Sequence, residues 1–591
     1  MENLSTTQAL QTLFRAIRML YKFKRSLLFI MCIKTLIEGM ITPLLLVVMQ
    51  QAINNIQTKT GNFTIIIWMF CFYFLIKILF EIFDTWLNVY TEKVQSLFSK
   101  DIELRIYDKI SSMDLEDFEN HETYDLLRRA QTQRGENIVS FFKEFMGILR
   151  ELINCAGMLI ILVRFNIVLV FLVTLIPIVQ YFFSLKIGKE QFSTMVARTS
   201  KERKVWYIDY LFTTGNAFKE LKLFNFESFL KIQYEKLKKI IITQDIKIAK
   251  KYANNSLLFT TFDLISSFGL YVYIGYKTFS SIILIGDMTT YINGIDSVKN
   301  SVSSCIQAAS NITRNSFYLS LLFKFLDQDN QNTTVGNDIR KKTITSIETI
   351  ELKNVSYKYL GSSDYAIKNV SFVLKKGSVL GIIGKNGSGK STLIKIILGF
   401  YKNYDGTVLV NSKDLRDIDS YSYQKQISAV FQDFIKYEFS LKDNVMISDI
   451  SKYNEEDKFI NSIKDVGLND YIHNHDMILG KWFEGTDLSI GQWQKVAIAR
   501  SIFKDCSMLI MDEADASLDV ISQKEIYKLI AKIYTNKIGI FVSHKVISTG
   551  KIASEILVLK KGEVVEYGSS EKLAENHKHY FEMLEADMDY N

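Results

Sequence analysis

The chain has 591 residues and a formal net charge of +7, so it is too long for one hydrophobic core and too weakly basic to indicate a nucleic-acid partner. Its five cysteines are scattered without a C-x-x-C pair, which argues against a disulfide framework or a zinc site. Hydrophobic residues make up 48% of the chain, but the long apolar runs gather in the first half. The second half has the pattern of a soluble α/β domain.

Apolar runs in the first half predict six membrane spans. Arg15, Arg18, Lys22, Lys24 and Arg25 precede the first run, and the positive-inside rule therefore places the N-terminus in the cytoplasm. Repeated runs of about twenty apolar residues favour membrane spans over a soluble helical bundle, which is the alternative interpretation. The predicted spans are residues 27–48, 63–83, 152–163, 167–187, 257–274 and 281–306.

Charged segments between the spans predict helices that extend into the cytoplasm. They cover 90–135 and 189–250, and turns are expected near 117–118 and 214–216. A tight external turn is expected at 164–166. The predicted domains are a transmembrane domain at 1–326, a polar linker at 327–346 and a soluble domain at 347–591.

The segment 384–392, GKNGSGKST, fits the P-loop pattern. An apolar run at 379–383 precedes it and predicts a buried strand, and the run at 393–398 predicts a helix. In that context consecutive backbone N–H groups and the helix N-terminus attract a phosphate. Lys390 is then expected to contact the β and γ phosphates of a nucleoside triphosphate, and Ser391 to hold Mg²⁺. A glycine-rich turn without a ligand is the alternative.

Acidic residues end a second apolar run, at 508–511. Asp512 is predicted to orient Mg²⁺ or its water, and Glu513 to act as the general base. An apolar run that ends in two acids is common by itself, but it becomes informative downstream of a P-loop. Gln432 can reach the metal or the water. His544 follows a predicted strand at 538–542 and can reach the γ-phosphate, although a lone histidine there is often a surface residue.

A second predicted helix start lies at 488–492, LSIGQ, where a short polar turn precedes a helix expected to begin at Gln492. Such a helix N-terminus is again an anion site. One domain cannot easily direct two separate helix N-termini at the same phosphate, whereas two facing copies can.

These motifs, in this order, resemble the nucleotide-binding domain of an ABC ATPase. Tyr359 is similar to the family's adenine-stacking aromatic residue, and 516–519 to its D-loop. Six spans before one such domain resemble a type IV ABC exporter half-transporter.

The resemblance implies ATP and Mg²⁺, a location in the cell membrane with the nucleotide-binding domain in the cytoplasm, and a second copy of the chain. A heterodimer remains the alternative. The resemblance also implies three sets of site residues. Glu513 and His544 would be catalytic, and Ser391, Gln432 and Asp512 would be metal ligands. The residues that would bind ATP are Tyr359, Gly384, Asn386, Gly387, Ser388, Gly389, Lys390, Ser391, Thr392, Gln432, Ser489, Gly491 and Gln492.

Further similarity concerns the cargo. The segments 485–489 and 492–494, together with 215–220, are similar to nisin-type lantibiotic and related peptide exporters. Ile490 departs from the family, which usually has glycine there, and its side chain is expected to crowd the nucleotide or slow turnover. The alternatives are a lipid or drug exporter, and an ABC protein that gates or senses instead of pumping.

Four acidic residues lie in or beside the predicted spans: Glu38, Glu81, Asp84 and Asp263. Charges inside a membrane usually face a water-filled cavity or a partner charge. Lys34 with Glu38, and Lys77 with Glu81, have the spacing of helical ion pairs. Asp263 lacks such a neighbour in sequence and is predicted to line the cavity, where it would favour a cationic peptide.

Overall fold

The chain folds into two compact units in the computed structural model. One unit comprises Met1–Ser111 and Glu122–Gln328, and the other Ser112–His121 and Asp329–Asn591. The structure describes residues 6–59, 62–120, 123, 126–127, 135–164, 166–214, 217–328, 341–514 and 518–590. Most of the predicted linker at 327–346 therefore lies outside the described residues, and the predicted domain boundaries stay a prediction.

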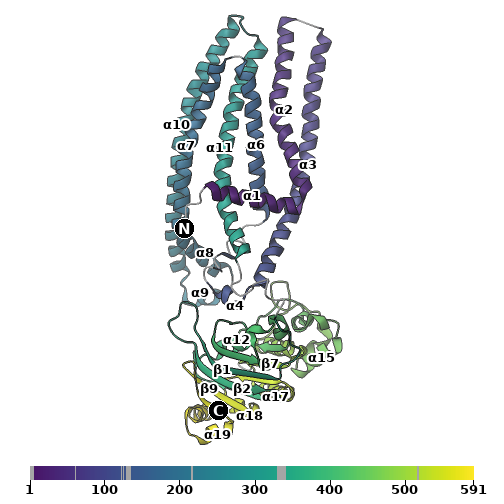
Figure 1. Cartoon of the computed structure of the whole chain (residues 1–591), viewed down its shortest axis with the longest axis vertical. Coiled ribbons are helices and arrows are strands. Elements are labelled where there is room, and N and C mark those ends of the chain that lie inside the picture. Colours follow the sequence, from purple (N-terminus) through teal and green to yellow (C-terminus); the bar gives the residue numbers. More distant parts are fainter. Residues whose placement is uncertain are drawn as a thin grey trace. The chain divides into compact units, whose positions relative to one another are not determined.

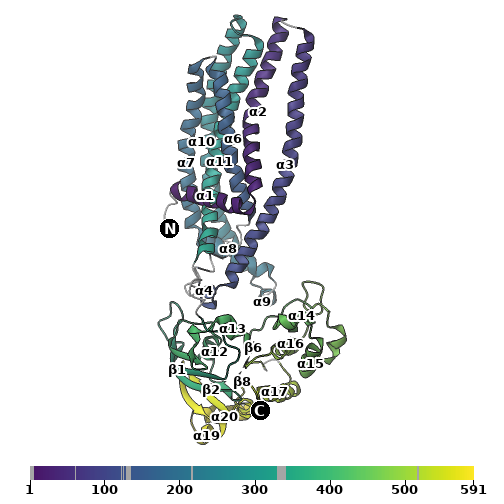
Figure 2. The same ribbon diagram turned by 45° about the vertical axis from the view of Figure 1, so that its right-hand side comes forward.

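Helices build the first unit. Among the described residues, the long helices α2, α3, α6, α7, α10 and α11 run alongside one another, and α1 lies across them in both views (Figures 1 and 2). The described bounds are α1 Thr6–Phe23, α2 Arg25–Thr58, α3 Phe63–Ser111, α6 Gly135–Val163, α7 Ile167–Ala197, α8 Thr199–Thr213, α9 Phe218–Phe224, α10 Glu227–Phe279 and α11 Ile285–Asp327.

Four helices among the described residues are long and apolar enough to cross a membrane: Arg25–Thr58, Phe63–Ser111, Asn137–Val163 and Glu227–Phe279. They contain the first, second, third and fifth predicted spans. The fourth lies in α7, where the side chains of 167–173 are outside the description. The sixth begins later than predicted, because 280–284 form the turn between α10 and α11, with Ser281 at φ 55°.

Two sheets and short helices form the second unit. The first sheet has the order β2-β1-β4-β5 and its pairs are antiparallel. The second has the order β10-β9-β3-β8-β7-β6, parallel except for the β9–β10 pair. The strands are β1 Thr349–Tyr357, β2 Ile367–Lys375, β3 Val379–Ile383, β4 Asp405–Val410, β5 Lys413–Asp414, β6 Ile427–Val430, β7 Met508–Asp512, β8 Ile538–Val542, β9 Glu555–Lys560 and β10 Glu563–Gly568.

The central strands β3, β7 and β8 are buried along their whole lengths, because helices cover both faces of the parallel sheet. The helices of this unit are α4 Leu115–Glu119, α12 Lys390–Ile397, α13 Ser420–Lys425, α14 Leu441–Met446, α15 Glu456–Asp465, α16 Ile490–Phe503, α17 Val520–Tyr534, α18 Val546–Ile552, α19 Ser570–Glu575 and α20 His579–Tyr590. The carboxyl ends of parallel strands share one edge, and Gln432, Glu513 and His544 meet there.

Candidate functional site

The predicted P-loop connects β3 to α12, as the sequence indicated. Gly389 caps α12 with φ 106°, a conformation that favours glycine. A Cβ atom there would lie 2.6 Å from the carbonyl oxygen of Ala366. A side chain at this position would therefore push the loop away from the backbone at Ala366, so a glycine is needed there.

Lys390 extends back across this loop. Its ammonium donates to the Gly384 carbonyl at 2.8 Å, and the residue is buried. Burial lowers the pKa of Lys390, while the nearby charges of Glu513 and Asp512 act in the opposite direction. The buried Ser388 Oγ has no hydrogen-bond partner among the described residues. An orphaned hydroxyl beside a buried cation fits an anion that is bound in the loop.

Glu513 brings the other predicted catalytic residues together. It follows β7 in a left-handed conformation, with φ 50°. Gln432 donates to one carboxylate oxygen at 2.6 Å, and Nε2 of His544 lies 2.7 Å from the other. The Glu513 side chain is 12% exposed, against 45% for His544. A carboxylate held between two polar groups at the sheet edge is suited to orient and deprotonate a water molecule.

Asp512 ends β7 and is 6% exposed. Burial raises its pKa to about 6, and the adjacent charge of Glu513 contributes in the same direction. The charge of Lys390 opposes both effects but does not cancel them. Because Lys390 does not fully balance the negative charge of this carboxylate, Asp512 is suited to bind a cation.

The 488–492 segment forms the start of α16, which begins at Ile490, two residues before the predicted start. The reason is a capping box: Ser489 Oγ accepts from the Gln492 N–H at 3.2 Å, and the Gln492 side chain accepts from the Ser489 N–H at 2.9 Å. Ile490 is 60% exposed and therefore does not fill the core of this unit. Its predicted effect on turnover stays a prediction.

The two helix N-termini belong to opposite faces of one sheet. Helix α12 packs with Leu380 and Ile382 of β3, whereas α16 packs in a separate core with Leu509 and Met511 of β7. In β7 the alternate residues Met508 and Ile510 join the α12 core, since successive strand side chains point to opposite faces. The sheet thus separates the two anion-attracting ends within one chain.

Tyr359 lies just beyond β1 and is 38% exposed. Its hydroxyl is 2.8 Å from Thr392 Oγ1 in the P-loop segment, which places the ring beside the predicted site. The predicted D-loop at 516–519 lies partly outside the described residues, which resume at Leu518. Asp519 caps α17 by accepting from the N–H groups of Ile521 and Ser522.

Sequence reasoning gave no role to Gln494. This residue is 2% exposed, and its amide donates to the backbone carbonyl of Glu513 at 3.3 Å. Its signal was present in the sequence: it is a polar side chain directly beside Trp493 and close to the buried apolar run 496–499 of α16. It supports the left-handed turn that presents the Glu513 carboxylate.

Comparison with known proteins agrees with this geometry. The ABC transporter family matches residues 367–516. The subtilin transport ATP-binding protein SpaT of Bacillus subtilis is 31% identical over 97% of this chain and 94% of its own length. The nisin transport ATP-binding protein NisT of Lactococcus lactis subsp. lactis is also 31% identical, over 97% of this chain and 96% of its own length. The chain is an ABC exporter half-transporter. A solved bacterial Atm1-family ABC exporter with ATP bound shares the fold, with a TM-score of 0.78 at 18% identity over 95% of this chain and 98% of that one.

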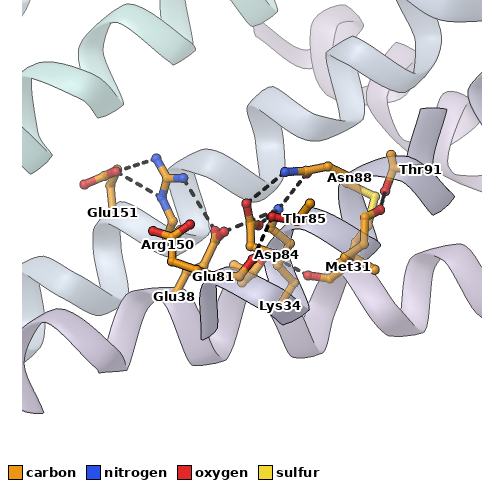
Figure 3. Close-up of polar contacts among 12 residues, drawn as sticks. Met31, Lys34, Glu38, Glu81, Asp84, Thr85, Asn88, Thr91, Arg150 and Glu151 are labelled. Carbon is orange, nitrogen blue, oxygen red and sulfur yellow. Dashed lines mark hydrogen bonds and ion pairs between the residues drawn. The ribbon is translucent and has the colours of Figure 1, made fainter. Parts of the chain in front are cut away.

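This exporter lies in the membrane with its nucleotide-binding domain in the cytoplasm, and it couples ATP hydrolysis to transport. Charged side chains of neighbouring membrane helices form ion pairs with one another (Figure 3). Lys34 of α2 pairs with Glu38 at 3.4 Å, as predicted, and also with Asp84 of α3. Arg150 of α6 lies 3.5 Å from Glu38 and 2.7 Å from Glu151. The result is a continuous set of ion pairs over three helices.

The structure bears on two expectations about the membrane charges. Asp263 of α10 lies 2.7 Å from the ammonium of Lys299 on α11, and Lys299 also donates to Ser267. Its charge is therefore balanced by a neighbouring helix, and its predicted place in the cavity stays a prediction. No ion pair joins Lys77 and Glu81 within the part of the chain that the structure describes. Helical spacing brings the two side chains within reach but does not require a pair, because their rotamers also decide whether the charged ends meet.

Proposed function

We propose that two copies of this exporter form two shared ATP sites, and that the cargo is a peptide. The observation that supports the shared sites is the separation of α12 and α16 by one sheet. A P-loop from one copy and Ser489, Gly491 and Gln492 from the other would then hold one triphosphate between two helix N-termini. A heterodimer with a related chain satisfies the same geometry.

Each residue near the P-loop has a role in this proposal. Backbone groups of 384–389 cradle the phosphates, Lys390 supplies positive charge, and Tyr359 stacks on adenine. Glu513 accepts a proton from the attacking water, while Gln432 and His544 orient that water and the γ-phosphate. Ser391, Gln432 and Asp512 fit Mg²⁺, since all three offer oxygen donors and Asp512 is undercompensated. When bound, the metal neutralises charge that develops on the phosphates.

The peptide cargo is supported by the two full-length relatives, whose names refer to the transport of subtilin and nisin. Transport of a lipid or hydrophobic drug is the second candidate. It rests on the putative multidrug export protein YgaD of Bacillus subtilis, which is 24% identical over 88% of this chain.

The test is ATP hydrolysis by the exporter in lipid vesicles, with cationic lantibiotic-like peptides, lipids and hydrophobic drugs as separate additions. Stimulation by peptides, together with ATP-dependent accumulation of a labelled peptide inside inverted vesicles, is the expected result. Stimulation by lipids or drugs alone would contradict a peptide cargo. Hydrolysis that no addition changes, without accumulation, would favour a gate or sensor.

A further inference from the structure

The short helix α4 contacts the nucleotide-binding domain through acidic side chains. It lies in the segment between α3 and α6 but belongs to the same compact unit as the sheets. Asp114 pairs with Lys402 at 2.8 Å, and Glu116 accepts from Asn403 at 2.8 Å. Glu119 accepts from Lys395 at 3.1 Å and from the Tyr401 hydroxyl at 2.9 Å. One of these partners, Lys395, lies in the P-loop helix α12, and the other three follow that helix in the chain.

Tyr401 differs from the other partners because it is fully buried. Its hydroxyl accepts from Lys395 at 3.0 Å while it donates to Glu119. Burial raises the pKa of Tyr401, and the hydrogen bond to Glu119 adds to the increase. The hydroxyl therefore stays protonated, and Glu119 serves as its acceptor.

Three tyrosine rings connect this hydrogen bond to the predicted adenine site. Tyr401 stacks on Tyr357 with ring centres 4.8 Å apart and planes at 6°. Both rings meet Tyr359 edge to face, at 5.9 Å from Tyr401 and 5.4 Å from Tyr357. Tyr359 is the partly exposed member of the three, and its hydroxyl is fixed by Thr392. The orientation of its ring is thus set by two buried rings and one hydrogen bond.

We propose that Glu119 is a positioning residue for Tyr359 and acts through the Tyr401 hydroxyl. The intracellular segment between α3 and α6 would then adjust the affinity of the site for the adenine base. Linkage makes the effect reciprocal: a loop movement that breaks the Glu119–Tyr401 bond weakens adenine binding, and adenine binding strengthens that bond. This inference rests on the proposed role of Tyr359 in adenine stacking.

The test uses the full-length exporter in vesicles and compares Tyr401→Phe, Glu119→Ala and the double variant. Tyr401→Phe keeps the stacked ring and removes only the hydroxyl. Each single change is expected to raise the KM for ATP by about three- to tenfold with kcat within about twofold, the size of one hydrogen bond. Each change also removes a contact with Lys395, but the Glu119–Tyr401 bond is the contact that both remove and that reaches the ring of Tyr359. The double variant should therefore raise the KM no more than the larger single effect. The inhibition constant of inorganic tripolyphosphate, which has no base, should stay unchanged.

Two variants separate positioning from simple docking. Tyr404→Phe removes another buried hydroxyl, one without a hydrogen-bond partner among the described residues, and should leave the KM unchanged. Asp114→Ala breaks the neighbouring contact of α4 with Lys402. It should not alter the preference for ATP over tripolyphosphate, whereas a docking role alone would give it the same effect as Glu119→Ala.

A further variant, Tyr359→Ala, tests the proposed adenine site separately from the proposed positioning role of Glu119. If it leaves the KM for ATP unchanged, the proposed adenine site is wrong. If it raises the KM while Tyr401→Phe and Glu119→Ala do not, the adenine site stands and the positioning role is overturned. Independent, multiplying effects of the Tyr401 and Glu119 changes would also overturn it.

Discussion

The nucleotide-binding domain and the membrane helices both hold charged groups, but they compensate them differently. Lys390 bonds to a backbone carbonyl, and Asp512 has a raised pKa because its surroundings do not fully balance its charge. In the membrane helices, Lys34, Arg150 and Lys299 each lie in an ion pair. The difference teaches that incompletely compensated charge marks the ligand site, whereas balanced charge joins helices.

The largest effect should come from Glu513→Gln. The substituted amide keeps the size of the side chain but cannot accept the proton of water, so kcat should fall by about 10²–10⁴-fold while ATP still binds. Hydrolysis and nucleotide-binding assays on the purified exporter measure both quantities. Glu563→Gln, which changes an exposed carboxylate paired with Lys368, is the matched control and should be near normal. A Glu513→Gln rate within a few-fold of the parent would show that another group is the base.

Mixing two inactive variants tests whether the sites are shared. Lys390→Ala removes the P-loop cation, and Ser489→Arg blocks the N-terminus of α16. A mixed dimer keeps one site with both parts intact, so co-reconstitution should restore part of the hydrolysis that each variant lacks alone. If each chain used its own 488–492 segment, no activity would return. Complete recovery would be equally incompatible with one intact site per mixed dimer.

The raised pKa of Asp512 predicts how the stability of the nucleotide-binding domain depends on pH, with an effect of intermediate size. Its pKa of about 6 in the folded chain exceeds its ordinary value of 3.8, so the folded state binds the extra proton between these values. Stability from this group therefore decreases as pH rises from about 4 to 6. At pH 7 without Mg²⁺, Asp512→Asn should increase the stability of the domain by about 1–3 kcal/mol.

Thermal unfolding of the exporter with and without Mg²⁺ and ATP measures this change. The parent should gain stability from Mg²⁺ with ATP, and the Asn variant should gain less. Asp505→Asn is the control, since Asp505 is exposed and its pKa is lowered. Lower stability of Asp512→Asn at pH 7 would show that the Asp512 charge is already balanced.

The smallest functional effect is expected from Asp263→Asn. Because Lys299 balances Asp263, the change should leave peptide stimulation of hydrolysis within about twofold and mainly reduce stability. The double variant Asp263→Asn with Lys299→Met, which removes both charges, should recover stability relative to the single change. Loss of peptide stimulation without loss of stability would instead place Asp263 in the cargo path.

Sequence patterns predicted which strand ends meet at the candidate site because its residues follow strands in a fixed order, whereas the roles of these residues stay predictions. Strand ends brought Gln432, Glu513 and His544 together as expected. The sequence patterns did not reveal the left-handed turn at Glu513 or the hydrogen bond by which Gln494 supports it. Both depend on the packing between α16 and β7. In the membrane half, apolar length located the helices, whereas the pairing of Asp84 with Lys34 depends on how α2 and α3 are rotated.

Close backbone contact between α2 and α6 limits the substitutions that either helix can accept. A Cβ atom at Gly39 would lie 2.7 Å from Ile153 Cβ, and one at Gly157 would lie 2.6 Å from the ring of Pro43. The two glycines stand on opposite helices, so each helix depends on the absence of a side chain in the other. A substitution at either position would push the helices apart, and neither helix could change at this contact without a compensating change in its partner.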